Sequence, residues 1–220
     1  MIFHILTIFP QMFDSYLSES ILARAIESKK IGVKLYNIRD YTKDRHKKVD
    51  GIPYGGGPGM VMNVQPIVST VDSILKKIKR SKKSKVKIIL TTPGGKQFTN
   101  TVAKKLEEKF DHIIIICGRY EGIDYRVTKI LKAEEYSIGD YVLTGGELPA
   151  MVMIDCISRQ VEGVLGAKES LEESRVSSHE VYARPEIFEY SGKKYRVPKV
   201  LLSGHHKKIE EWKSRKLKNS

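Results

Sequence analysis

Short apolar runs alternate along the chain with segments in which apolar residues recur every three or four positions. The apolar runs span residues 2–9, 33–38, 86–91 and 112–118, and a weaker run broken by a glycine spans 136–143. Apolar runs of this length predict strands that are covered on both faces, as in parallel sheets. The alternation therefore predicts an α/β fold with a parallel sheet.

The segments between these runs carry an apolar stripe at helical spacing and predict helices. The first of them, residues 12–28, places Phe13, Leu17, Leu22 and Ala25 on one such stripe. The stretch 39–62 shows no clear period and contains a cluster of glycines. The other predicted helices span residues 66–79, 99–110, 123–131, 147–161 and, as a basic surface helix, 206–218.

The pattern changes after Gly166. A polar stretch rich in Glu and Ser follows, and the tail beyond it has too few apolar residues to bury a core of its own. We therefore expect the tail to dock on the main domain or on a second subunit. The predicted organisation is a main domain over 1–165, a linker over 166–181 and a small, mainly helical C-terminal domain over 182–220.

Composition and charge narrow the function. The 220 residues are 40% apolar and 30% charged, which excludes a disordered or membrane-spanning chain, and 39 Lys and Arg against 26 Asp and Glu give a net charge of +13. Basic residues gather at 76–87 and from Lys193 onward, whereas 133–158 has none. This distribution predicts that the basic stretches bind a polyanion and that the segment without basic residues binds a different ligand. Two cysteines, Cys117 and Cys156, predict reduced thiols and a cytoplasmic protein.

Four glycine-rich loops follow the predicted strands, at 53–60, 91–95, 117–124 and 137–149. None matches a P-loop or a dinucleotide fingerprint. They offer backbone groups, aromatic rings and carboxylates, but no lysine for a phosphate except Lys96. This chemistry favours a nucleoside with a positive substituent, such as S-adenosylmethionine, at the carboxyl edge of the sheet.

Five segments carry a resemblance to a known family. VDGIPYGGGPGMVM, CGRYEGID, SIGDYVLTGGELPAMVMID, SRQVEGVLG and VPKVLLSGHHKKIEEW occur in the order seen in the bacterial tRNA (guanine-N1)-methyltransferases, the TrmD family. The resemblance runs from Met1 to about Trp212. It implies a parallel-sheet SPOUT fold with a deep trefoil knot and a homodimer whose active sites are shared between subunits.

The resemblance also implies the reaction: methyl transfer from S-adenosylmethionine to N1 of the guanosine immediately 3′ of the anticodon in tRNA, which maintains the reading frame. The cofactor would lie bent in the knot. Its walls would be Leu90, Thr91, Thr92, Pro93, Gly118, Tyr120, Glu121, Gly122, Ser137, Ile138, Gly139, Tyr141, Leu143, Gly145, Gly146 and Pro149.

Methylation at guanine N1 requires a base near N1 and a group that stabilises charge on O6. The resemblance assigns Arg159 to O6. The family has an aspartate as the base, and this chain departs from the pattern, because Glu173 stands at that position and Glu172 is the alternative. The segment up to Tyr182 is also a few residues shorter than usual and lacks the Asp that normally precedes the Tyr-x-Arg-Pro motif.

We expect the tRNA to contact the glycine-rich loop at 53–60, together with Arg119 and basic residues of the C-terminal tail. Magnesium is expected to stimulate the reaction while bound mainly through RNA, with no metal ligands from the protein. Two other functions stay open: a knotted methyltransferase with another RNA target, and a non-catalytic RNA-binding homologue. The predicted substrate contacts are Asp50, Tyr54, Gly55, Gly56, Gly57, Gly59, Arg119, Lys199 and Lys207.

Overall fold

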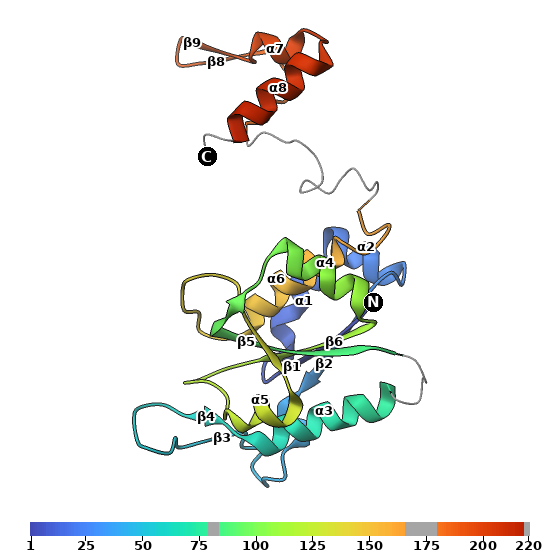
Figure 1. Cartoon of the computed structure of the whole chain (residues 1–220). Coiled ribbons are helices and arrows are strands. Elements are labelled where there is room, and N and C mark those ends of the chain that lie inside the picture. The colour runs from blue at the N-terminus through green and yellow to red at the C-terminus, as the bar shows by residue number, and fades with distance from the viewer. Residues whose placement is uncertain (79–83, 166–179, 218–220) are drawn as a thin grey trace. The chain divides into compact units, whose positions relative to one another are not determined.

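The computed structural model describes residues 1–78, 84–165 and 180–217. The chain divides into two compact units, Met1–Gly166 and Ala167–Ser220. The first unit contains a five-stranded sheet in the order β2-β1-β6-β5-β7 (Figure 1). All four neighbouring pairs are parallel, as the sequence predicts. The strands are β1 (Ile2–Thr7), β2 (Gly32–Asn37), β5 (Val86–Gln97), β6 (His112–Cys117) and β7 (Glu134–Ser137).

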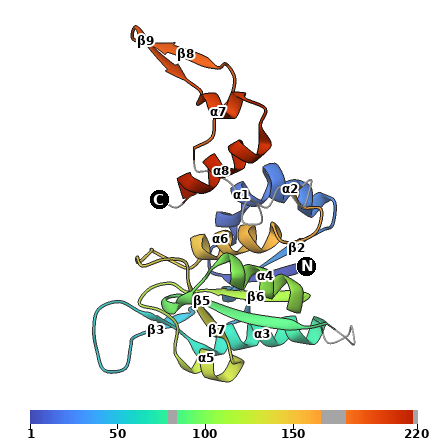
Figure 2. The ribbon, with the colours of Figure 1, turned by 45° about the horizontal axis from the view of Figure 1, so that its top comes forward.

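Helices cover both faces of this sheet (Figures 1 and 2). The helices α2, α4 and α6 pack on one face, and α3 and α5 pack on the other. The central strand β6 serves both layers, because Ile113 and Ile115 join one core whereas Ile114 and Ile116 join the other. The helix bounds are α1 (Asp14–Leu17), α2 (Ser20–Glu27), α3 (Val64–Ile78), α4 (Asn100–Lys109), α5 (Arg126–Leu131) and α6 (Glu147–Ser158).

The single helix predicted over 12–28 is wrong. The structure has a 3-10 turn, η1 (Pro10–Phe13), then the short α1, and after a break the helix α2, with Ser20 in the left-handed region at φ 55°. Phe13 and Leu22 are nine positions apart, so an unbroken helix would place them on opposite sides. The break lets both side chains enter the same core.

Two strand boundaries also differ from the prediction. The strand predicted over 86–91 continues to Gln97, and its pairing with β7 shifts between Thr91 and Lys96. The predicted loop 91–95 is therefore a bulge within β5, where glycine is needed because a Cβ on Gly95 would lie 2.6 Å from the backbone nitrogen of Tyr136. The strand predicted over 136–143 is the shorter β7, which starts earlier and ends at Ser137.

A small hairpin follows another 3-10 turn, η2 (Ile38–Tyr41), in the stretch that has no sequence period. Its strands β3 (Asp50–Gly51) and β4 (Val61–Met62) are antiparallel, and the glycine-rich loop between them projects away from the sheet (Figure 2). The glycine-rich loop was predicted from sequence, but the hairpin that carries it was not.

The second unit contains the antiparallel strands β8 (Ile187–Tyr190) and β9 (Lys193–Arg196), followed by α7 (Lys199–Leu202) and α8 (His206–Leu217). The helix predicted over 206–218 corresponds to α8, whereas the β8–β9 hairpin was not predicted. None of the side chains described between 180 and 214 is buried. Tyr182 and Trp212 lie against each other, with ring centroids 6.4 Å apart.

Candidate functional site

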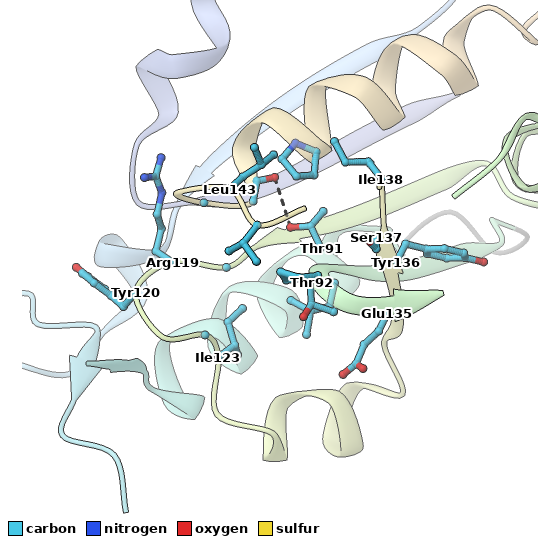
Figure 3. A pocket seen from close by; sticks show the side chains of 18 of the residues that line it. Thr91, Thr92, Arg119, Tyr120, Ile123, Glu135, Tyr136, Ser137, Ile138 and Leu143 are labelled. Carbon is cyan, nitrogen blue, oxygen red and sulfur yellow. Dashed lines mark hydrogen bonds between the residues drawn. The ribbon is translucent and has the colours of Figure 1, made fainter. Parts of the chain in front are cut away.

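A pocket of about 440 Å³ opens at the carboxyl ends of β5, β6 and β7 (Figure 3). The β5 bulge supplies Thr91, Thr92 and Pro93 to its wall. The loop after β6 and the loop that leads from β7 into α6 supply the rest. Ligands bind at this edge of parallel sheets, because the loops there converge and leave backbone groups free.

The pocket gathers every predicted cofactor wall except Gly139, which lies outside its lining. Gly139 nevertheless shapes the same loop, because its carbonyl accepts a hydrogen bond of 2.8 Å from the Ser137 hydroxyl. Eight further lining residues were not predicted as cofactor walls, although Arg119 was predicted as a substrate contact. Tyr125 and Thr128 belong to the start of α5, and the other six lie within two positions of predicted walls: Arg119, Ile123, Glu135, Tyr136, Val142 and Thr144.

Close backbone packing at Gly146 forms the base of the pocket. The Gly146 N–H donates to the Gly118 carbonyl at 2.8 Å, and the Thr91 hydroxyl lies 3.2 Å from the Ile116 carbonyl and 3.4 Å from that of Gly146. A Cβ on Gly146 would lie 2.7 Å from the Gly118 nitrogen and 2.9 Å from Cys117 Cα. Glycine is thus required for the approach of α6 to β6.

The described lining residues include two carboxylates, Glu121 and Glu135, and no lysine. Glu135 accepts a hydrogen bond of 2.9 Å from the Thr128 hydroxyl. Burial, with the nearby Glu134, raises the pKa of Tyr136 to about 12, so its hydroxyl remains neutral at physiological pH. This lining suits a ligand that carries positive charge better than one that carries phosphates.

Arg119 is the one cation in the described lining, and its side chain is already engaged. Its Nε donates to Glu147 Oε2 at 2.8 Å, and its guanidinium lies 4.8 Å from the Phe9 ring centroid. Arg119 was also predicted as a substrate contact. Its guanidinium is turned toward Glu147 in this structure, and the contact with tRNA stays a prediction.

The β3–β4 hairpin carries most of the predicted substrate contacts. Its base is joined to the pocket loop, since the Glu121 N–H donates to the Met60 carbonyl at 3.0 Å and the Met62 N–H donates to the Gly122 carbonyl at 2.9 Å. Beyond this base the loop is open. Tyr54 is 100% exposed, Asp50 is half-buried in β3, and a Cβ on Gly55, Gly56 or Gly57 would meet nothing within 4 Å.

Gly59 differs from the other loop glycines. All four loop glycines have a positive φ, but only at Gly59 would a Cβ collide with a neighbour, the Glu121 carboxylate. Gly59 therefore marks the point where the open loop meets the pocket wall. The loop predicted to contact tRNA and the predicted cofactor walls are thus neighbours in the fold.

The predicted catalytic residues are not brought to this pocket within the described chain. Arg159 lies at the C-terminal end of α6, whereas the pocket lies at the start of that helix, beside Gly146 and Pro149. A helix of twelve residues separates the two ends by about 18 Å. Glu173 and Glu172 lie outside the described residues.

The predicted tail contacts lie in the second unit. Lys199 begins α7 and Lys207 lies in the first turn of α8, and both side chains are exposed. Exposed lysines on short helices can contact phosphates without a fixed geometry. Their role in tRNA binding remains a prediction.

Three further features bear on function. Within the described ranges, no three His, Cys, Asp or Glu side chains are grouped as metal ligands would be, and no helix there is long and apolar enough to cross a membrane. Cys117 and Cys156 are not joined by a disulfide. Cys117 is buried directly beneath the pocket, and burial raises its pKa well above the usual value.

A parallel sheet with helices on both faces and a glycine-walled pocket at its carboxyl edge defines the class: an α/β protein with a nucleoside-type ligand site. Comparison with known proteins identifies the family. The model of the tRNA (Guanine-1)-methyltransferase TrmD family matches residues 1–220, so the chain belongs to this family.

Curated relatives and a solved structure agree with this family assignment. The chain is 49% identical over 215 residues to a tRNA (guanine-N(1)-)-methyltransferase of Clostridioides difficile, covering 96% of this chain and 90% of the relative. It is 50% identical over 214 residues to one of Thermomicrobium roseum, covering 96% and 76%.

The crystal structure of the tRNA (m1G37) methyltransferase from Aquifex aeolicus matches 100% of this chain and 91% of that chain, with a TM-score of 0.78 and 38% identity. The similarity confirms the predicted SPOUT-type parallel α/β fold. The trefoil knot stays a prediction.

Proposed function

We propose that this chain transfers a methyl group from S-adenosylmethionine to N1 of the guanosine immediately 3′ of the anticodon in tRNA. One observation carries the proposal: a family match over residues 1–220 coincides with a pocket lined by the cofactor residues that the family resemblance implies. Since the relatives are named for the same reaction, the site and the family support one function.

The pocket suits the methyl donor. Its volume of about 440 Å³ lies within the range of small-molecule sites, and its lining combines apolar side chains with backbone polar groups. Glu121 and Glu135 favour a ligand with a positive sulfonium. S-adenosylmethionine, when bound, supplies an electrophilic methyl group.

The protein must then prepare guanine N1, which carries a proton at neutral pH. We assign Glu173 to accept this proton and Arg159 to stabilise the charge that develops on O6. Tyr54 and the open glycines after it would hold the guanosine, and Lys199 and Lys207 would contact phosphates. Stimulation by magnesium bound mainly through RNA, and a cytoplasmic location, complete the proposal.

A second copy of the chain would complete each site. Arg159 is about 18 Å along α6 from the pocket of its own chain. An exposed apolar face, made of Met12, Tyr16, Leu148 and Val152, lies on η1, α1 and α6, and Tyr16 is tied to α6 by a hydrogen bond of 2.6 Å to Asp155. Both observations support a homodimer in which α6 of one subunit serves the pocket of the other.

Methyl transfer to tRNA tests the function. Unmodified transcripts that carry G or another base after the anticodon are incubated with labelled S-adenosylmethionine. We expect label only in the G transcript. Equal labelling of both would favour a different RNA target, and no labelling of either alongside tRNA binding would favour the RNA-binding homologue.

A pair of isosteric variants tests the base. Glu173→Gln should lower methyl transfer by at least about 100-fold while S-adenosylmethionine affinity is retained, because only the proton acceptor is lost. Glu172→Gln is the matched control and should stay near the wild-type rate. The reverse result would move the base to Glu172.

Mixed dimers test the shared site. Arg159→Ala removes the O6 contact, and Thr92→Trp fills the pocket from a half-buried wall position. Each variant alone should be inactive. Co-expressed in equal amounts, they should recover about a quarter of the wild-type activity, since half of the dimers then contain one intact site. No recovery, with mixed dimers present, would place the whole site in one chain.

A further inference from the structure

A buried ion pair lies at the edge of the pocket. Glu147, the first residue of α6, is only 1% exposed, and its Oε2 accepts the hydrogen bond of 2.8 Å from Arg119, whose side chain is 16% exposed. The other carboxylate oxygen accepts a hydrogen bond of 2.7 Å from the hydroxyl of Thr7, the last residue of β1. Glu147 thus joins α6, β1 and the loop after β6.

The surroundings fix Arg119 in this orientation. Its Nη1 donates to the Thr144 carbonyl at 3.2 Å, and its Nη2 lies 3.0 Å from Met12 Sδ. A Cβ on Gly145 would lie 2.7 Å from Arg119 Cδ, so glycine leaves the space that the guanidinium occupies. Arg119 is therefore held against the pocket wall.

The positive charge of Arg119 would repel the positively charged ligand that we propose. S-adenosylmethionine carries one net positive charge from its sulfonium, whereas the product, S-adenosylhomocysteine, is a neutral thioether. An unpaired guanidinium in the lining would repel the donor and leave the product unaffected. Glu147 cancels this charge from beneath, leaving Glu121 and Glu135 as the unbalanced charges of the described lining.

We infer that Glu147 is a charge-compensating and positioning residue that lets the pocket bind the sulfonium donor without discrimination against it. The inference rests on the proposed function. Glu147 does not line the pocket, so it acts through Arg119. If Glu147 acts in this way, its loss should change the ratio of the affinity for the donor to the affinity for the product, which loss of packing alone would not do.

Calorimetric titration of both ligands at low salt tests the inference. In Glu147→Gln, which keeps the shape but removes the charge, the donor-to-product affinity ratio should fall about three- to tenfold. In Arg119→Gln the ratio should move in the opposite direction. The double variant should return the ratio to that of the wild type, even if both affinities are lower.

Thr7→Val is the matched control, because it removes the hydrogen bond to Glu147 and leaves the ion pair. It should alter both affinities equally. If Glu147→Gln does not fold, the direction of change in Arg119→Gln decides alone. Equal losses for both ligands in the charge variants would overturn the inference only. A wild-type chain that binds neither ligand would overturn the proposed function as well.

Discussion

The two edges of the five-stranded sheet contain different kinds of residue. At the carboxyl edge, glycines and threonines bring backbones together around a pocket. Toward the amino edge, His4 is 3% exposed and lies 3.1 Å from the Tyr36 hydroxyl and 3.0 Å from Nδ1 of His112. The pocket edge leaves backbone groups open to a ligand, whereas the side chains of His4, Tyr36 and His112 contact one another.

The difference between the two regions indicates that the pocket edge serves ligand binding and the histidine cluster serves the stability of the fold. The pocket loops leave backbone groups for a ligand, whereas the polar groups of the histidine cluster bond to one another. In open α/β sheets the carboxyl edge is where ligands bind, so the amino edge is free to be optimised for packing. Changes at the first edge should alter affinity most, and changes at the second should alter the free energy of unfolding.

Gly146→Ala should have the largest effect. The added methyl meets the Gly118 nitrogen and Cys117 Cα, both of which are backbone atoms that cannot rotate away. Overpacking of this kind costs about 1–3 kcal/mol and would displace the start of α6. We expect S-adenosylmethionine affinity to fall by about 100-fold, measured by calorimetry, and the melting temperature to fall.

Gly94→Ala is the matched control, because its Cβ meets nothing within 4 Å and its φ is not positive. Affinity and melting temperature should both stay near wild-type values. If Gly94→Ala were as damaging as Gly146→Ala, close packing would not explain the glycines of this edge.

The amino edge should make stability depend on pH. Burial, with smaller contributions from His112, Lys34 and Lys77, lowers the pKa of His4 to about 4. An unfolded histidine has a pKa near 6.5, so between these values the unfolded chain binds more protons than the folded chain. The free energy of unfolding should therefore fall as pH drops through this window, by about 2 kcal/mol between pH 7.5 and 5.

Urea unfolding at both pH values measures this effect. His4→Gln should reduce the pH dependence, whereas His46→Gln, at an exposed position, should retain it. Burial also lowers the pKa of the neighbouring His112, so part of the effect should remain in the His4 variant. A pH dependence unchanged by His4→Gln, or a loss of S-adenosylmethionine affinity in that variant, would break the separation of the two edges.

The sequence predicted the sheet because apolar residues dominate each central strand, as a strand covered on both faces requires. The prediction from sequence was wrong where packing in the folded chain, rather than the local pattern, decides the structure. Apolar residues recur at helical spacing over 12–28, but one unbroken helix would place Phe13 and Leu22 on opposite sides, and the break before α2 lets both reach the same core. The bulge in β5 was equally hidden, because a Thr-Thr-Pro-Gly-Gly stretch is typical of a loop.

Some features of the candidate site could likewise be predicted from sequence, and others could not. The loops that form the pocket were accessible from sequence, because they are contiguous glycine-rich segments after strands, and the family resemblance supplied the individual wall residues. The Arg119–Glu147 pair was not, since its residues are 28 positions apart and only the fold brings them together. The helix predicted over 147–161 already separates Arg159 from Gly146 and Pro149 at its start, and the structure has the same separation along α6.

The β3–β4 hairpin sharpens the comparison, because it extends the binding edge beyond the sheet without sharing its packing. Tyr54 is fully exposed, so Tyr54→Ala should leave the melting temperature and S-adenosylmethionine affinity unchanged. Stacking of a base on an aromatic ring is worth about 1–3 kcal/mol, so kcat/KM for tRNA should fall at least about tenfold. Ile52→Ala, 82% exposed on the same hairpin, is the matched control and should change kcat/KM little. Equal losses in both variants would mean that the hairpin contributes surface rather than a specific contact from Tyr54.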